Sequence, residues 1–441
     1  MLLCCSVSLV RAQIPGSPVT ALKEMKNVFG GTGTDRAFAI IETSDSGYLV
    51  AGYTDSNTHD VSGNHGNIDV WVVKLNRKWE IQWQKTLGGS GDEGAASVIQ
   101  TTDGGYLLVG NTDSSDGDIS AYHGGDRNIW IVKLSSAGAI VWEKNYGGSL
   151  EDRALSVVQT TDGGYAVTGY SGSNDGDVTL NRGSLDGWVL KLDNTGTLQW
   201  QKSFGGSGID ICNHIIQTTD GGYAVAGSSD SNDGDVSGNH GGRDFWVIKL
   251  GSSGSLEWQK TLGGTDDDGS TSLVQAPDGG YVVAGFSKSN NGNVSGNHGS
   301  EDVWVLKLNS TGSLVWQKTF GGTGDDVAYS IIKTNDGKYA MAGISTSNNG
   351  DVSGNHGSRD CWIIKTDTTG NTIEWQKTIG GTLDDQAHAL IQTADGNYMT
   401  AGFSISETGD IAGPAYGLDD FFVSELTADG KVIRIFSDSG Q

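Results

Sequence analysis

The chain has 441 residues, among them 69 Gly, 13 Trp and 4 Pro, and its formal net charge at pH 7 is −25. A collagen helix is excluded because no Gly-X-Y period occurs, and a disordered chain is disfavoured because 36% hydrophobic residues with 13 Trp can form a core. The acidic balance disfavours nucleic acid and anionic membranes as partners. Length alone suggests two or three domains.

The first ten residues form an apolar run of signal-peptide length that is too short to span a membrane. The residues before Gln13 fit a small-residue cleavage site, although no basic segment precedes the run. We therefore expect an incomplete signal peptide at 1–12, a linker at 13–21, and export to the periplasm, the cell surface or the medium. The alternative is a buried core segment. No other apolar stretch approaches membrane length.

The cysteines indicate no covalent framework. Cys4 and Cys5 would leave with the signal peptide, and Cys212 and Cys361 are far apart in sequence. Neither a disulfide framework nor a cysteine-based metal site is expected.

A Gly-Gly pair recurs every 58 or 59 residues and divides the chain into seven repeats. The repeats start near Gly30, Gly88, Gly147, Gly205, Gly263, Gly321 and Gly380. A tyrosine has the same period, at Tyr48, Tyr106, Tyr165, Tyr223, Tyr281, Tyr339 and Tyr398.

Twelve of the 13 Trp follow the same period in two ladders. The first ladder is Trp71, Trp130, Trp188, Trp246, Trp304 and Trp362, with Phe422 in the seventh place. The second is Trp83, Trp142, Trp200, Trp258, Trp316 and Trp375, and Trp79 belongs to neither. Repetition in every copy favours a core role over a sugar-stacking platform.

Each repeat contains four strand-like runs, which in the fifth repeat are 270–275, 281–286, 303–308 and 314–320. Gly- and Asp-rich tight turns separate the first run from the second and the third from the fourth. Seven such units predict an all-β, seven-bladed β-propeller with four antiparallel strands per blade, a single domain over 22–441. Much of the glycine excess is then turn chemistry.

Closure of the ring poses a question, because eight segments resemble the fourth strand of a blade. Six of them lie inside the repeats, and the other two, of which one is surplus to seven blades, are 25–31 near the N-terminus and 430–437 near the C-terminus. We expect the C-terminal segment to complete blade seven, because the short turn before it is retained.

The pattern Trp316-Gln317-Lys318-Thr319-Phe320-Gly321-Gly322, Asp325-Asp326 and Gly337-Lys338-Tyr339 resembles the propeller repeats of secreted surface proteins of Bacteroidota. The match covers about residues 25–437, and a similarity to kelch repeats is much looser. The resemblance implies an extracytoplasmic propeller with mostly undefined ligands, and it implies no catalytic residues. Larger members carry a C-terminal sorting domain that is not apparent here, so passage across the inner membrane is expected and type IX export is not.

One carboxylate per repeat opens the first strand, usually with a second acid just before it. These ring acids are Asp35, Glu93, Asp152, Asp210, Asp268, Asp326 and Asp385. If the first strand is innermost, they surround the mouth of the central channel and form a cation site or a funnel for a basic ligand. The alternative is that each caps backbone N–H groups of its own Gly-rich turn.

The loop between the second and third strands repeats an Asp-Gly-Asp motif and a histidine. The histidines are His65, His123, His240, His298 and His356. The spacing does not match an EF-hand, and equivalent histidines of different blades are too far apart to share Zn²⁺. We expect these histidines to order the loop, and Ca²⁺ is the only cofactor that stays open.

Departures from the repeat are the better candidates for specific binding. The first and third positions after the ring acid vary from blade to blade, and the fourth is Ser or Ala in every blade except at His214, which suits an asymmetric ligand. The foremost candidates are Arg36, Arg153, Asn213, His214, Tyr329 and His388. Ordinary sequence drift is the alternative.

These observations lead to three functional hypotheses. The first is a secreted, monomeric, non-catalytic propeller that binds a protein or glycan on its loop-rich acidic face. The second is a glycan hydrolase or lyase that uses channel-mouth carboxylates, although no nucleophile or metalloprotease motif is present. The third is a Ca²⁺-stabilised scaffold.

Overall fold

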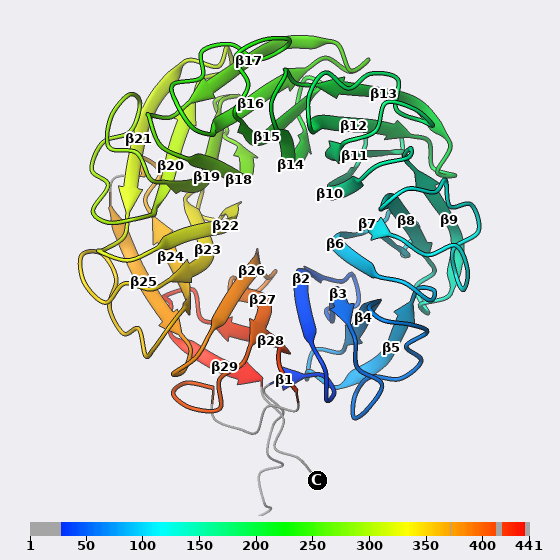
Figure 1. Cartoon of the computed structure of the whole chain (residues 1–441). Helices are drawn as coiled ribbons and strands as arrows, with labels where there is room; N and C mark the ends of the chain where they lie inside the picture. The colour runs from blue at the N-terminus through cyan, green and yellow to red at the C-terminus, as the bar shows by residue number, and fades with distance from the viewer. Residues whose placement is uncertain (1–27, 371, 412–416, 437–441) are drawn as a thin grey trace, which may run out of the picture.

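The computed structural model describes residues 28–370, 372–411 and 417–436, so the predicted signal peptide (1–12) and linker (13–21) lie outside the described residues. The described chain forms seven antiparallel sheets, the blades, arranged as a closed ring around a central channel (Figure 1). Six have four strands, and the seventh has five because two short strands share the place of its fourth. It contains no helix, and therefore none that is long and apolar enough to cross a membrane. The predicted seven-bladed propeller is confirmed.

Every blade is a meander whose first strand lies nearest the channel. The first strands are β2 (Asp35–Glu42), β6 (Glu93–Gln100), β10 (Asp152–Gln159), β14 (Asp210–Gln217), β18 (Asp268–Gln275), β22 (Asp326–Lys333) and β26 (Asp385–Gln392). The second are β3 (Tyr48–Thr54), β7 (Tyr106–Thr112), β11 (Tyr165–Ser171), β15 (Tyr223–Ser229), β19 (Tyr281–Ser287), β23 (Tyr339–Ser345) and β27 (Tyr398–Ser404).

The third and fourth strands complete each blade toward the outside of the ring. The third are β4 (Asp69–Leu75), β8 (Asn128–Leu134), β12 (Asp186–Leu192), β16 (Asp244–Leu250), β20 (Asp302–Leu308), β24 (Asp360–Thr366) and β28 (Asp420–Leu426). The fourth are β5 (Ile81–Leu87), β9 (Ile140–Tyr146), β13 (Leu198–Phe204), β17 (Leu256–Leu262), β21 (Leu314–Phe320) and β25 (Ile373–Ile379), with β1 (Val28–Phe29) and β29 (Val432–Phe436) in blade seven.

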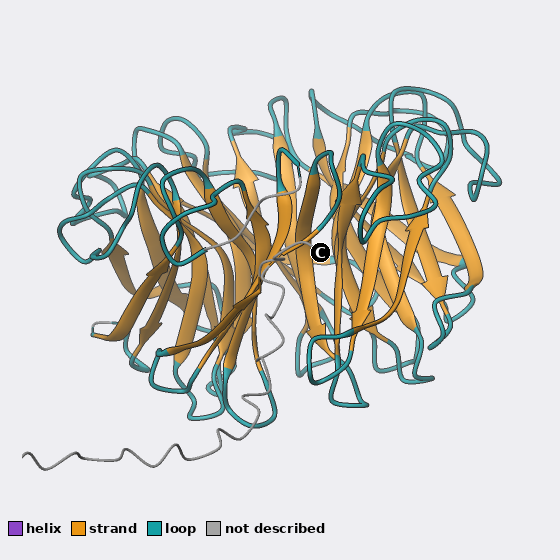
Figure 2. Ribbon diagram, turned by 90° about the horizontal axis from the view of Figure 1, so that it is seen from below, coloured by secondary structure: helices purple, strands orange, loops and turns teal. Residues whose placement is uncertain are grey.

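The connections differ between the two faces of the ring, as Figure 2 shows from the side. On one face the first and second strands, and the third and fourth, are joined by tight turns, such as the one in which Gly279 has a φ of 80°. On the other face lie the long loops between the second and third strands and the Gly-Gly segments between blades. We call this second side the loop face.

The two Trp ladders lie between blades and hold neighbouring sheets together. Third-strand Trp side chains are at most 2% exposed, and the indole N–H of Trp304 donates to Gln317 on the next strand (2.8 Å). A fourth-strand Trp packs on the next blade, as Trp258 does against Tyr281 with ring centroids 5.8 Å apart. The core interpretation of these residues is confirmed.

Both chain ends close the ring, which differs from the expectation that the C-terminal segment alone would do so. Antiparallel β29 pairs with residues 423–426 of β28, and β1 pairs with Phe421 and Phe422 of the same strand. The fourth strand of blade seven is thus split between the two ends of the chain. We call the contact between blades seven and one the seam.

Candidate functional site

The ring acids lie buried at the blade junctions, where they cap the Gly-Gly segments. Asp326 accepts the backbone N–H of Gly322 (2.8 Å) and the hydroxyls of Ser345 and Ser347, the latter at 2.7 Å. Each of the other six also accepts the second N–H of its Gly-Gly pair, and all seven are at most 1% exposed. These are the contacts of the capping interpretation.

A second buried carboxylate faces six of the seven ring acids from the third strand of the preceding blade, and the amide of Asn128 takes its place opposite Asp152. A Cβ on Gly321 would lie 2.7 Å from Asp302 Oδ1 and 2.7 Å from Asp326 Oδ2, so only glycine fits between them. Burial raises the pKa of both carboxyls. The equivalent third-strand residues are Asp69, Asn128, Asp186, Asp244, Asp302, Asp360 and Asp420.

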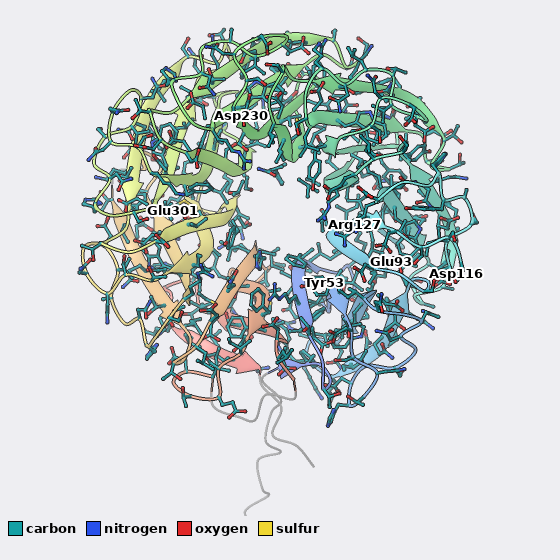
Figure 3. The ribbon with its side chains drawn as sticks, viewed as in Figure 1. Tyr53, Glu93, Asp116, Arg127, Asp230 and Glu301 are labelled. Carbon is teal, nitrogen blue, oxygen red and sulfur yellow. The ribbon has the colours of Figure 1, made fainter. Side chains whose placement is uncertain are left out.

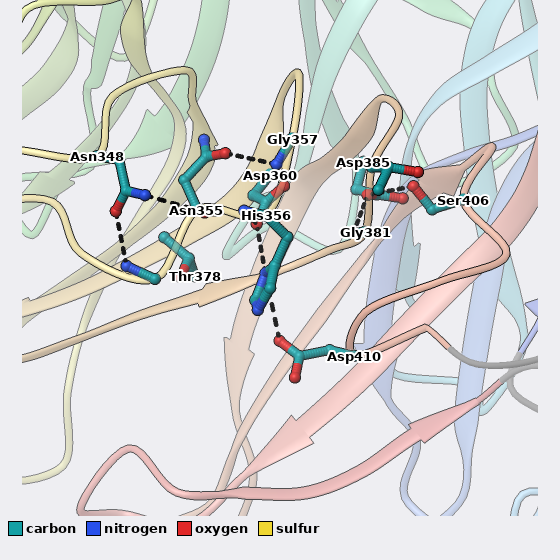
Figure 4. A network of polar contacts seen from close by, with 12 residues as sticks. Asn348, Asn355, His356, Gly357, Asp360, Thr378, Gly381, Asp385, Ser406 and Asp410 are labelled. Carbon is teal, nitrogen blue, oxygen red and sulfur yellow. Dashed lines mark hydrogen bonds and ion pairs between the residues drawn. The ribbon is translucent and has the colours of Figure 1, made fainter.

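The loop histidines bind these third-strand carboxylates. Nδ1 of His298 lies 2.7 Å from Asp302 Oδ2, which also accepts the backbone N–H of that histidine at 2.9 Å. Figure 4 shows the equivalent contact of His356 with Asp360 (2.9 Å), beside the ring acid Asp385. His65 and His240 make the same contact, whereas His123 faces Asp177 instead. These contacts are those expected of loop-ordering residues.

The Asp-Gly-Asp motifs order the same loops. Asp233 accepts the backbone N–H of Ser207 (2.7 Å), and Asp235 accepts that of Gly205 (3.4 Å). Over the described ranges, no group of three or more His, Cys, Asp or Glu side chains is arranged to hold a metal ion. The Ca²⁺ hypothesis gains no donor set from these loops.

Three of the variable candidates lie together at the channel wall, across blades six, seven and one. The rings of Tyr329 and His388 are stacked, with centroids 4.7 Å apart and planes 12° apart. His388 also stacks on Phe403 (5.8 Å) and meets the edge of Phe38 (4.9 Å). The guanidinium of Arg36 lies over the ring of Phe403, 4.3 Å from its centroid.

In this group of side chains the aromatic rings contact residues of neighbouring blades: His388 of blade seven contacts Tyr329 of blade six and Phe38 of blade one. Burial, and then the charge of Arg36, lower the pKa of His388 to about 4, so its imidazole is neutral at pH 7. Arg36 is itself bound to Asp419 at 2.7 Å. The group is therefore an inter-blade packing cluster, and sequence reasoning identified three of its members from their departure from the repeat.

The other variable candidates lie in blades three and four and do not join this cluster. The side-chain amide of Asn213 donates to the Ser270 carbonyl of the next blade (2.7 Å), and Nδ1 of His214 accepts the Leu273 N–H (3.4 Å). Burial lowers the pKa of His214 to about 4. Arg153 forms an ion pair with Glu151 at 2.7 Å. The structure therefore does not bring the six candidates into one site.

A rim of ion pairs surrounds the channel on the loop face, and the residue-by-residue reading of the sequence missed most of it. Arg127 binds Asp92 (3.2 Å), and Lys288 binds Glu301 (3.1 Å). Figure 3 shows Arg127 beside the channel. Each of these four residues immediately precedes or follows a strand of the structure, and each position varies between the repeats.

Charge is distributed unevenly between the two faces. The connections on the loop face contain 22 Asp and Glu residues and five Lys and Arg residues. The short turns on the opposite face contain 11 Asp and Glu residues and four Lys and Arg residues. Several turn acids are also neutralised by a buried third-strand lysine, as Asp45 is by Lys74 (2.9 Å) and Asp220 by Lys249 (3.0 Å). The loop face is thus the acidic face of the ring.

Comparisons with known proteins agree with the fold and go no further. No protein-family model matches the chain. It is 26% identical to the regulatory protein FlaEY of Caulobacter vibrioides over 196 residues, 41% of this chain and 20% of that protein, so it spans a fifth of the length of that relative.

Three solved structures illustrate the structural similarity. Puromycin hydrolase matches with a TM-score of 0.53 at 11% identity, over 93% of this chain and 55% of that one. The Neurospora crassa Pan2 WD40 domain gives 0.49 at 12%, over 92% of each chain. A Bacteroides caccae protein of unknown function gives 0.39 at 12%, over 85% and 92%. At such identities the similarity shows the fold alone: this chain is a repeat β-propeller.

Proposed function

We propose that this chain is a secreted, monomeric, non-catalytic β-propeller that binds a protein or glycan through its acidic loop face. The observation that carries the proposal is the contrast between the faces, because one has short turns with lysine-paired acids and the other has long loops with a large excess of acid. Loops on a rigid scaffold are where binding residues concentrate. An acidic surface also accelerates encounter with basic partners.

Charge reversal on either face tests this proposal. The mature chain would be assayed on a glycan array and against a display library of small folded domains. Asp126→Lys with Glu407→Lys alters exposed acids of the loop face, and Glu80→Lys with Asp429→Lys is the matched control on the other face. We expect only the loop-face pair to weaken binding. Equal effects from both pairs would contradict the proposal.

Export is part of the proposal and has its own test. The chain would be expressed in a Gram-negative host with a short lysine-containing extension before Met1, which supplies the basic segment that the apolar run lacks, and the N-terminus of the periplasmic product would be sequenced. We expect it to begin at Gln13. A product that stays in the cytoplasm with residues 1–12 intact would contradict export.

A further inference from the structure

Exposed large apolar side chains are rare on the acidic loop face and occur in only two blades of the described chain. They are Leu150 (51% exposed) and Leu180 (42%) in blade three, and Leu383 (48%) and Leu418 (72%) in blade seven. The remaining exposed large apolar residues belong to fourth strands, outside the loop face. Blades three and seven lie on opposite sides of the channel in Figure 1.

The other blades act as internal controls for these four positions. Where blades three and seven have Leu150 and Leu383, the remaining blades have Gly33, Gly91, Gly208, Asp266 and Gly324. Blades four to six have Gly238, Gly296 and Gly354 in place of Leu180, and Gly242, Ser300 and Ser358 in place of Leu418. The blade fold therefore does not require leucine at any of the four.

Two of these leucines coincide with the loss of a capping hydrogen bond. In blade two, Asp113 accepts the backbone N–H of Asp92 (2.6 Å), and a Cβ on Gly91 would collide with that Asp113 carboxylate. In blades three and seven the capping position holds Gly172 or Ile405, neither of which has a side-chain acceptor. Compared with blade two, blades three and seven therefore lack a capping hydrogen bond and expose a leucine side chain, and neither change stabilises the fold.

We propose that blades three and seven together dock a folded protein that presents two apolar side chains within a basic surface. Apolar residues at the centre of an interface, with charge around them, supply most of its binding energy. The surrounding loops are strongly acidic, so the complementary surface is basic. Two anchors on opposite sides of the channel require a partner wide enough to span it, which favours a folded protein over a sugar. This inference rests on the proposed function and names its partner class.

The test restores the residues of the other blades at the four positions. A display library of a randomised small folded domain would be selected on the full chain. Binding of the selected clones would then be measured for Leu150→Gly with Leu180→Gly, for Leu383→Gly with Leu418→Ser, and for all four together. Val141→Gln with Val315→Gln is the control, because both valines are exposed on fourth strands where blades one and three have Gln82 and Gln199.

We expect the selected clones to combine apolar residues with Lys and Arg. Their affinity should fall at least tenfold with either leucine pair removed and should not change in the control. Clones that bind the four-substitution variant equally well, or that depend on one blade only, would overturn the two-point docking. Loop-face binding of glycans or clones that ignores the leucines would leave the proposed function standing and this inference overturned, whereas no binding of any kind would overturn both.

Discussion

The seam and the six other blade junctions solve the same packing problem with different residues. At a regular junction the chain runs continuously from one blade into the next, and a fourth-strand Trp lies against the next blade. At the seam the chain is interrupted inside the fourth strand: β1 continues through Gly30 and Gly31 into β2 of blade one, whereas β29 comes from the other end of the chain. Arg434 of β29 occupies the position of that Trp. Trp79 of blade one replaces the missing fourth-strand Trp as the ring that covers Tyr48: the two rings are stacked, with centroids 4.6 Å apart and planes 15° apart.

The remaining differences also concentrate in blade seven. The indole–glutamine hydrogen bond of blades one, three, five and six is replaced by Phe422 and Ile435, which are both apolar. The residue that corresponds to the loop histidine is Tyr416, outside the described residues. Burial and the nearby charge of Asp35 raise the pKa of Asp420 to about 8.

Among the substitutions that test the difference between the seam and the regular junctions, removal of Trp79 should cause the largest loss of stability. Trp79→Ala leaves a cavity over Tyr48 at the junction whose fourth strand is split between the two ends of the chain, so we expect a loss of about 3–5 kcal/mol in the free energy of unfolding. Denaturant titration would measure it. The double variant Trp79→Gly with Arg434→Trp restores the regular arrangement and should recover most of the loss. No recovery would show that the two tryptophans are not equivalent.

Introducing the Trp–Gln hydrogen-bonded pair of other blades into blade seven should have an intermediate effect on stability. Phe422→Trp alone places an indole N–H opposite Ile435 with no acceptor, which we expect to cost about 1–3 kcal/mol. Adding Ile435→Gln supplies the acceptor that Gln317 provides to Trp304, so thermal denaturation of the double variant should return close to the wild type. A double variant no better than the single one would contradict the pairing.

Substitution of the third-strand aspartate should change the pH dependence of Tm differently at the seam and at a regular junction, by a few degrees in Tm. Because Asp420 has a higher pKa when folded than when unfolded, its stabilising contribution is complete below pH 4 and is lost as the pH rises through 8. Asp420→Asn should therefore reduce the fall in Tm between pH 7 and 9, and Asn128 shows that blade two accommodates this residue. At a regular junction, Asp302→Asn should instead destabilise the protein, because His298 loses its carboxylate. Equal behaviour of the two variants would remove the distinction.

Metal removal should have the smallest effect. The loop acids and histidines hydrogen-bond to one another and to backbone N–H groups, so we expect EDTA to leave Tm unchanged at the seam and at the regular junctions. A clear rise in Tm on adding Ca²⁺ would revive the third functional hypothesis.

The sequence by itself determined the number of blades, the four strands in each, the core role of the tryptophans and the capping alternative for the ring acids. These follow from local rules, because turn residues and alternating strands repeat with a fixed period and each repeat reports on the others. Tertiary structure decided what depends on residues far apart in the chain. It placed both ends against β28, assembled Arg36, Tyr329 and His388 in one cluster but left Asn213 elsewhere, and buried the ring acids. Only ring closure sets which variable residues become neighbours, because those residues come from blades that are far apart in the chain.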